Sequence, residues 1–79
     1  MEMGKIMDHF AQRLKQLRQE KGLSQDALGE IIGVSNHAVS TYETGKNYPE
    51  VKKFFVLAEY FEVSLDYLAG WSDIREIQR

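Results

Sequence analysis

The fold is decided by the stretch Ser24-Gln-Asp-Ala-Leu-Gly-Glu-Ile-Ile-Gly-Val-Ser-Asn-His-Ala-Val-Ser-Thr-Tyr-Glu-Thr-Gly-Lys46, which predicts two short amphipathic helices joined at one glycine. Gly33 is expected to end the first of these helices in the left-handed conformation, which glycine adopts without steric cost. At about 100° per residue, a helix over residues 25–32 collects its apolar side chains on one face. We expect this face to meet the core: Ala27, Leu28, Ile31 and Ile32.

The second helix of this stretch has one packing side and one uncharged polar side. Ser35 is expected to be its N-cap, because a serine hydroxyl can accept a hydrogen bond from a backbone N–H that has no helical partner. Ala38, Val39 and Tyr42 fall together on the packing side. Side chains that both donate and accept hydrogen bonds, as reading base edges in the DNA major groove requires, fall on the opposite side: Asn36, His37, Ser40, Thr41 and Thr44.

These residues resemble the helix-turn-helix DNA-binding domains of the phage-repressor and Cro type, which include the xenobiotic-response-element-like regulators. The resemblance covers roughly residues 10–70 and implies an all-α fold, a compact five-helix repressor-like domain whose helices 2 and 3 form the helix-turn-helix. The alternative is a purely structural helical hairpin within a bundle that does not bind nucleic acid. The positions that carry the resemblance are Leu23-Ser24-Gln25, Leu28, Gly33-Val34-Ser35, Val39-Ser40, Tyr42-Glu43-Thr44-Gly45-Lys46 and Pro49.

Length and composition limit the class of protein. Seventy-nine residues make one domain at most. The chain has no cysteine, which excludes disulfides and cysteine-based zinc sites and favours a reducing cytoplasm. No apolar run approaches membrane-spanning length. His9 and His37 fall on different helices with no convincing third ligand for a metal. No hydroxyl group has both a histidine to act as its base and an acidic residue to orient that histidine. We therefore expect no metal, no cofactor and no enzymatic activity.

The net charge of −2 arises from ten basic and twelve acidic residues and counts mildly against a nucleic-acid binder. The distribution matters more than the sum, because the acids are concentrated after Pro49. We expect a neutral-to-basic DNA face, to which Lys46 and one cluster of basic residues contribute: Arg13, Lys15, Arg18 and Lys21.

The flanking sequence predicts three more helices within one DNA-binding domain over residues 8–70. The first runs over residues 8–21, with Asp8 as its N-cap and Phe10, Leu14 and Leu17 as its buried stripe. The last runs over residues 65–69, between the N-cap Ser64 and Gly70. The helix between them runs over residues 51–61 and is expected to bury six side chains: Val51, Phe54, Phe55, Leu57, Ala58 and Phe61.

Glu62 departs from the resemblance, because a glycine commonly ends this helix in the family. The turn there is expected to be slightly strained.

The resemblance also implies where DNA would be contacted. In the family, base edges are contacted by the first residues of the second motif helix and by the residue five positions after the first. Here these would be Asn36, His37 and Thr41, with Ser40 a weaker candidate. Asparagine can pair with adenine, histidine can donate to guanine, and the Thr41 methyl group can pack on a thymine methyl group.

Other residues are expected to position the domain without reading bases. Gln25 from the start of helix 2, and Lys46 and Asn47 from the loop after helix 3, would contact phosphates. The resemblance also implies an ion pair between Arg18 and Glu43. This pair would join the first helix to the end of the second motif helix, which is the recognition helix because it would read the DNA bases.

The tail over residues 71–79 lies outside the resemblance and holds three apolar residues, Trp71, Ile74 and Ile77. Val56 and Tyr60 are expected to point away from the core. We consider three roles for the tail: cover for its own Val56 and Tyr60, a dimer contact formed by all five residues, or a disordered connection to a further domain.

Two functional classes follow from the sequence. The first is a transcription regulator, in the first place a repressor, that binds double-stranded DNA at a two-fold operator as a homodimer. The alternative is a protein-interaction module, such as an antitoxin or adaptor, that keeps the fold without the DNA face.

Overall fold

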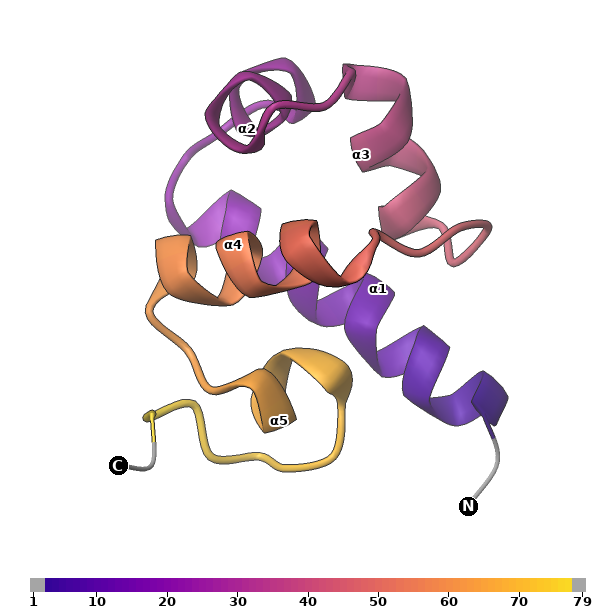
Figure 1. Ribbon diagram of the computed structural model, residues 1–79, viewed down its shortest axis with the longest axis vertical. Coiled ribbons are helices and arrows are strands. Elements are labelled where there is room, and N and C mark those ends of the chain that lie inside the picture. Colours follow the sequence, from indigo (N-terminus) through magenta and orange to yellow (C-terminus); the bar gives the residue numbers. More distant parts are fainter. Residues whose placement is uncertain (1–2, 78–79) are drawn as a thin grey trace.

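The chain folds into five helices in the computed structural model, which describes residues 3–77 and the side chains of residues 9–77. No strand occurs among these residues, so the predicted all-α, five-helix fold is confirmed. In Figure 1, α2 and α3 form one end of the molecule, α5 and the following segment form the other, and α1 and α4 lie between them. The helices are α1 (Met3–Glu20), α2 (Gln25–Ile32), α3 (Asn36–Glu43), α4 (Val51–Phe61) and α5 (Leu65–Ala69).

Helix α1 begins at Met3, so the prediction that Asp8 is its N-cap is wrong. The predicted start relied on the stripe of Phe10, Leu14 and Leu17. Before Phe10, Met3, Ile6 and Met7 occur at helical spacings and no proline interrupts the segment, so the helical pattern extends further toward the N-terminus than this stripe. Phe10, Leu14 and Leu17 are buried as expected.

The turn between α2 and α3 is built from local features and from one close backbone approach. Gly33 has φ 80°, and the Ser35 hydroxyl accepts a hydrogen bond from the Ala38 N–H at 3.0 Å. Gly29, within α2, lies so close to the turn that a Cβ atom there would be 2.6 Å from the Val34 carbonyl oxygen. A glycine at position 29 therefore lets α2 pack directly against the turn that sets the direction of α3.

The core is smaller than the sequence predicted. Ile31 is 43% exposed, and Val51 and Phe55 are 69% and 52% exposed, so their assignment to the core is wrong. On α4, the buried stripe follows Leu57, Ala58 and Phe61, and Val51 and Phe55 lie on the flank of that stripe. The packed positions form one cluster: Phe10, Leu14, Leu17, Leu28, Ile32, Val39, Tyr42, Leu57, Ala58, Phe61, Val63, Tyr67 and Leu68.

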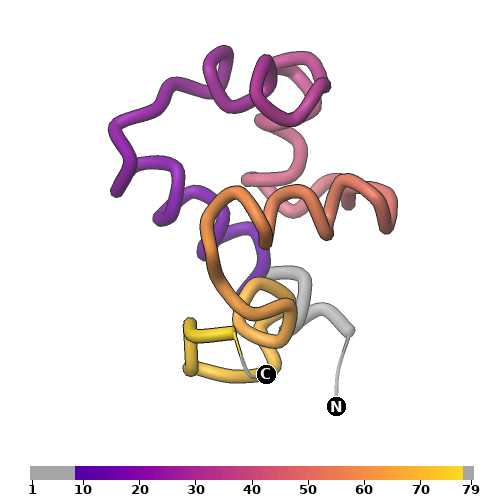
Figure 2. The backbone as a smooth tube through the Cα atoms, turned by 60° about the vertical axis from the view of Figure 1, so that its left-hand side comes forward, coloured from indigo at the N-terminus to yellow at the C-terminus, as the bar shows by residue number. Residues whose placement is uncertain are grey.

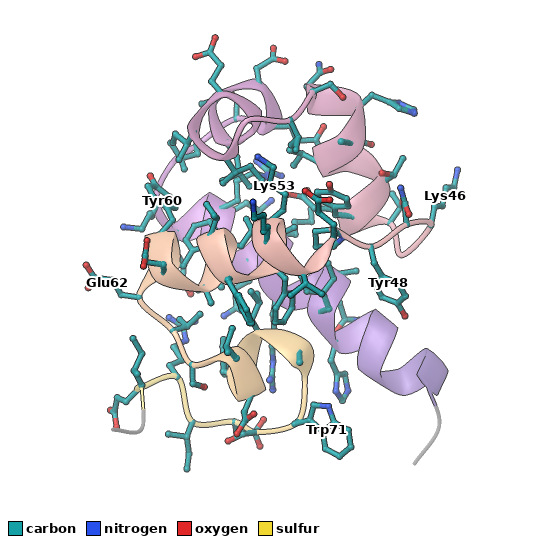
Figure 3. The ribbon with its side chains drawn as sticks, viewed as in Figure 1. Lys46, Tyr48, Lys53, Tyr60, Glu62 and Trp71 are labelled. Carbon is teal, nitrogen blue, oxygen red and sulfur yellow. The ribbon has the colours of Figure 1, made fainter. Side chains whose placement is uncertain are left out.

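Tyr60 packs against the core, contrary to the expectation that it points away from it. Its ring lies 5.0 Å from that of Phe61, and the Lys21 ammonium group lies 5.2 Å from its centroid. Val56 is exposed as expected. Nearby, the Lys53 ammonium group donates to the carbonyl oxygen of Ile32 at 2.6 Å, and Figure 3 shows this side chain reaching from α4 toward α2.

The segment after α5 folds back against α5 and α1, and Figure 2 shows it turning beside α5. Arg75 pairs with both carboxylate oxygens of Glu20, at 2.9 and 2.7 Å, which raises the pKa of Arg75 and lowers the pKa of Glu20. Arg13 donates to the carbonyl oxygens of Tyr67 and Ser72. These contacts, rather than cover for Val56 and Tyr60, hold the segment in place. Three of its apolar side chains remain exposed: Trp71, Ile74 and Ile77.

The end of α4 contains a residue in an unfavourable backbone conformation. Glu62 has φ 56° and ψ 44°, and it is the only non-glycine residue with positive φ among those the structure describes. A side chain in this region costs about 1–2 kcal/mol. We therefore expect Glu62→Gly to raise the free energy of unfolding by roughly 1 kcal/mol, after the greater entropy of glycine in the unfolded chain is offset.

Thermal unfolding followed by circular dichroism measures this effect, and about 1 kcal/mol corresponds to roughly 4–8 °C in Tm for a domain of this size. Glu59→Gly is the matched control, since the same change inside the regular helix should destabilise by about 1 kcal/mol. A Glu62→Gly variant that melts below the parent would show that this turn is not strained.

Candidate nucleic-acid interface

Helix α3 has a buried side and an exposed polar side. Val39 and Tyr42 are buried and Ala38 is half-buried, which fixes the helix against the core. Asn36 and His37 are exposed, and Ser40 and Thr41 are half-buried. In Figure 1, α3 lies at the edge of the molecule next to α2. The four predicted base-reading residues therefore share one accessible side of one rigid helix.

Hydrogen bonding within the helix decides what these side chains can offer. The Thr41 hydroxyl donates to the Ala38 carbonyl oxygen at 2.8 Å. Its hydrogen is thus already used, and Thr41 offers mainly its methyl group and an oxygen lone pair. Within residues 9–77, no hydrogen bond joins the side chains of Asn36, His37 or Ser40 to another group of the protein. Their donors and acceptors are therefore available to a ligand.

The three predicted phosphate-contacting residues flank α3. Lys46 and Asn47 are exposed in the loop after it, and their backbone N–H groups donate to the Thr41 carbonyl oxygen at 3.0 and 3.3 Å. Figure 3 shows the Lys46 side chain extending outward from this loop. Gln25 is half-buried at the first position of α2, where its amide donates to Glu43 at 3.2 Å. An amide nitrogen carries two hydrogens, so one remains for another acceptor.

Arg18 and Glu43 join α1 to the last residue of α3. The Arg18 guanidinium donates to both carboxylate oxygens, at 2.6 and 3.0 Å, and also to the Leu23 carbonyl oxygen at 2.8 Å. The Glu43 side chain is only 3% exposed. Hydrogen bonding to Glu43 raises the pKa of Arg18 above its ordinary value. Together with the Gln25 amide, this cluster holds both helices of the helix-turn-helix to α1.

Most side chains of the basic cluster expected on the DNA face contact other parts of the protein. Arg13 binds the segment after α5, Arg18 binds Glu43, and Lys21 lies over the Tyr60 ring. Only Lys15 of the four has no such contact among the described residues, so three members of the expected basic cluster are held by partners within the protein. The partners of Arg13 and Lys21 are distant in sequence, where spacing gives no signal, whereas the Arg18–Glu43 pair is the one that the resemblance implied.

Among the described residues, no group of three His, Cys, Asp or Glu side chains could hold a metal ion. In the same part of the chain, no helix has both the length and the apolar character needed to cross a membrane.

The geometry is that of a helix-turn-helix domain, and comparison with known proteins gives the family. The family described as Helix-turn-helix matches residues 14–68, which is more than half of the chain. The chain belongs to this family, as the resemblance implied.

Known relatives and solved structures agree with this assignment. The chain is 36% identical over 64 residues to the uncharacterised HTH-type transcriptional regulator YobD of Bacillus subtilis (strain 168), covering 81% of this chain and 57% of YobD. It is 35% identical over 65 residues to the HTH-type transcriptional activator BcrR of Enterococcus faecalis, covering 82% of this chain and 32% of BcrR. The chain thus spans about a third to just over half of these relatives' length.

The fold is also similar to that of the P22 c2 repressor solved in complex with a synthetic operator. The two chains superpose with a TM-score of 0.75 at 30% sequence identity, covering 80% of this chain and 96% of the repressor chain. The compared region of the repressor is thus a domain of about the same extent as this one.

Proposed function

We propose that this chain is a sequence-specific DNA-binding transcription regulator that reads its operator with α3. The observation that carries the proposal is the accessible, uncharged polar side of α3, held rigidly by a buried apolar side and by the Arg18–Glu43 pair. The similarity to a repressor solved with its operator supports it. Repression is the expected direction, although the relatives include an activator. Such a regulator is not an enzyme and would act in the cytoplasm.

The proposed base contacts are those of Asn36, His37 and Thr41, with Ser40 beside them, and Gln25, Lys46 and Asn47 would hold phosphates. Each good base contact would contribute about 1–3 kcal/mol of discrimination. Because the Thr41 hydroxyl is bonded within its own helix, its contribution is expected to come from the methyl group packed against a thymine methyl group.

A pair of substitutions at Thr41 tests this proposal. We expect Thr41→Val, which keeps a methyl group and loses the hydroxyl, to bind the preferred DNA site nearly as tightly as the parent. Thr41→Ser keeps the hydroxyl and loses the methyl group, and should bind roughly fivefold or more weakly, the effect of about 1 kcal/mol. Fluorescence anisotropy with labelled DNA measures both affinities.

The matched DNA control replaces the contacted thymine by uracil, which lacks the methyl group. This change should weaken the parent and the Thr41→Val variant but leave Thr41→Ser almost unaffected. If Thr41→Ser binds as tightly as the parent on thymine DNA, the methyl contact is absent.

We further propose that the chain binds its operator as a homodimer through the exposed apolar flank of α4 and α5. One recognition helix covers about half of a two-fold operator, so two copies are needed. The flank replaces the predicted pair of Val56 and Tyr60, because Tyr60 is packed against the core. Its members are exposed in the single chain: Tyr48, Val51, Phe55, Leu65 and Ile77.

The shape of this flank favours a second copy as the partner. Phe55 separates two apolar hollows, one next to Tyr48 and Val51, the other next to Leu65 and Ile77. A two-fold interface must be complementary to itself. A ridge with a hollow on either side meets this requirement, since each Phe55 can enter a hollow of the other copy. Ile77 keeps its predicted role, whereas Trp71 and Ile74 remain exposed away from both hollows.

A further inference from the structure

The cationic side chains of this chain are mostly engaged by the protein itself. Eight of the ten lysines and arginines have side chains that the structure describes, the other two being Lys5 and Arg79. Five of the eight make internal contacts with carboxylates, carbonyl oxygens or aromatic rings: Arg13, Arg18, Lys21, Lys53 and Arg75.

The internal contacts leave few cationic side chains free to move toward DNA. Arg18 is 11% exposed and bonded to three oxygen atoms, so it cannot turn outward without leaving Glu43 unpaired. Lys53 is bonded to the end of α2, and Arg75 is bonded to Glu20 on both carboxylate oxygens. Among the described cations, only Lys15, Lys46 and Lys52 have no such partner.

Of these three lysines, Lys46 alone belongs to the region around the recognition helix. It follows the α3 cap Thr44 by two residues, and its side chain extends outward (Figure 3). Lys15 lies on α1 and Lys52 on α4, outside the helix-turn-helix. The other groups expected to hold phosphates, those of Gln25 and Asn47, are uncharged.

We infer that this chain holds the DNA backbone mainly with uncharged donors, and that Lys46 is, among the cations whose side chains the structure describes, the one in each protomer that pairs with a phosphate. This inference rests on the proposed function and specifies how the same interface works. Cation–phosphate pairs supply most of the sequence-independent affinity for DNA, because they release condensed counterions. A surface with one such pair binds bulk DNA weakly, so a larger share of operator affinity comes from base contacts.

The salt dependence of operator binding tests this inference. The logarithm of the binding constant falls with the logarithm of salt concentration by about 0.9 for each phosphate neutralised. A dimer with two Lys46 contacts should therefore show a slope of about −2 and lose about 12-fold in affinity between 50 and 200 mM salt. A protein with six to ten cationic contacts would lose about 10³- to 10⁵-fold over the same range.

The experiment measures affinity for the selected operator at several salt concentrations, using the complete chain and Gln variants of single lysines. We expect Lys46→Gln to bring the slope close to zero. Lys15→Gln and Lys52→Gln are matched controls on exposed lysines, and Lys5→Gln and Arg79→Gln extend the set to the remaining cations. All four controls should keep the slope of the parent.

The outcomes separate this inference from the proposed function. A parent slope steeper than about −4, or a slope reduced by any of the four controls, overturns the inference while leaving DNA binding intact. The absence of operator binding at every salt concentration overturns the proposed function, and the inference with it.

Discussion

Glu43→Gln is expected to lower the free energy of unfolding by about 3–5 kcal/mol, because it leaves the Arg18 guanidinium charged and unpaired in a largely buried position. The Glu43 carboxylate accepts two hydrogen bonds from Arg18 and one from Gln25. A glutamine has one acceptor oxygen and would turn an N–H group toward another donor. Since domains are stable by only about 5–15 kcal/mol, the variant should be close to unfolding at 37 °C.

Urea unfolding followed by circular dichroism at 15 °C measures this loss. Glu30→Gln, which neutralises an exposed carboxylate on α2, is the matched control and should change the free energy of unfolding by less than about 0.5 kcal/mol. A Glu43→Gln variant that is within 1 kcal/mol of the parent would show that this pair does not hold α1 to α3.

Phe55→Glu is expected to make the chain monomeric and to weaken operator binding by about 30- to 1,000-fold, the equivalent of losing 2–4 kcal/mol at an interface hot spot. The carboxylate would have to be desolvated in an apolar hollow of the second copy. Because Phe55 is 52% exposed in the single chain, the fold should survive the substitution.

Sedimentation velocity at tens of micromolar measures the oligomeric state without DNA. Val56→Glu is the matched control, since Val56 is the next residue of α4, is also exposed and lies outside both hollows. The control should dimerise as the parent does. If Phe55→Glu remains dimeric, or if Val56→Glu alone abolishes the dimer, the α4–α5 flank is not the interface.

The helix-turn-helix could be predicted from sequence because its determinants are local. Gly33 and Ser35 end one helix and begin the next through their own backbone conformation and hydroxyl group, and both do so in the structure. The bounds of α2 and α5 follow from such signals, because each helix lies between a capping serine and a glycine in the left-handed conformation. Gly29 was not singled out, although a glycine inside a helical pattern is a recognised sign of a close backbone approach.

Apart from the start of α1, the errors arose where side chains meet partners that are distant in sequence. The partner of Arg13 is 59 residues away at Ser72, and that of Arg75 is 55 residues away at Glu20, so no spacing rule joins them. The assignment of Val51 and Phe55 to the core failed for a related reason. The width of an apolar face shows which side chains prefer burial, whereas the neighbouring helices decide how many of them are covered.

The most direct test of the central claim, that α3 reads a specific DNA sequence, is selection of binding sites by the purified chain from a random DNA pool. The measurement is the sequence of the bound fraction after several rounds at low salt. We expect it to converge on an inverted repeat whose half-sites are centred about one helical turn apart, roughly 10–10.5 base pairs. A pool that remains random after selection, with the protein folded, would contradict the claim.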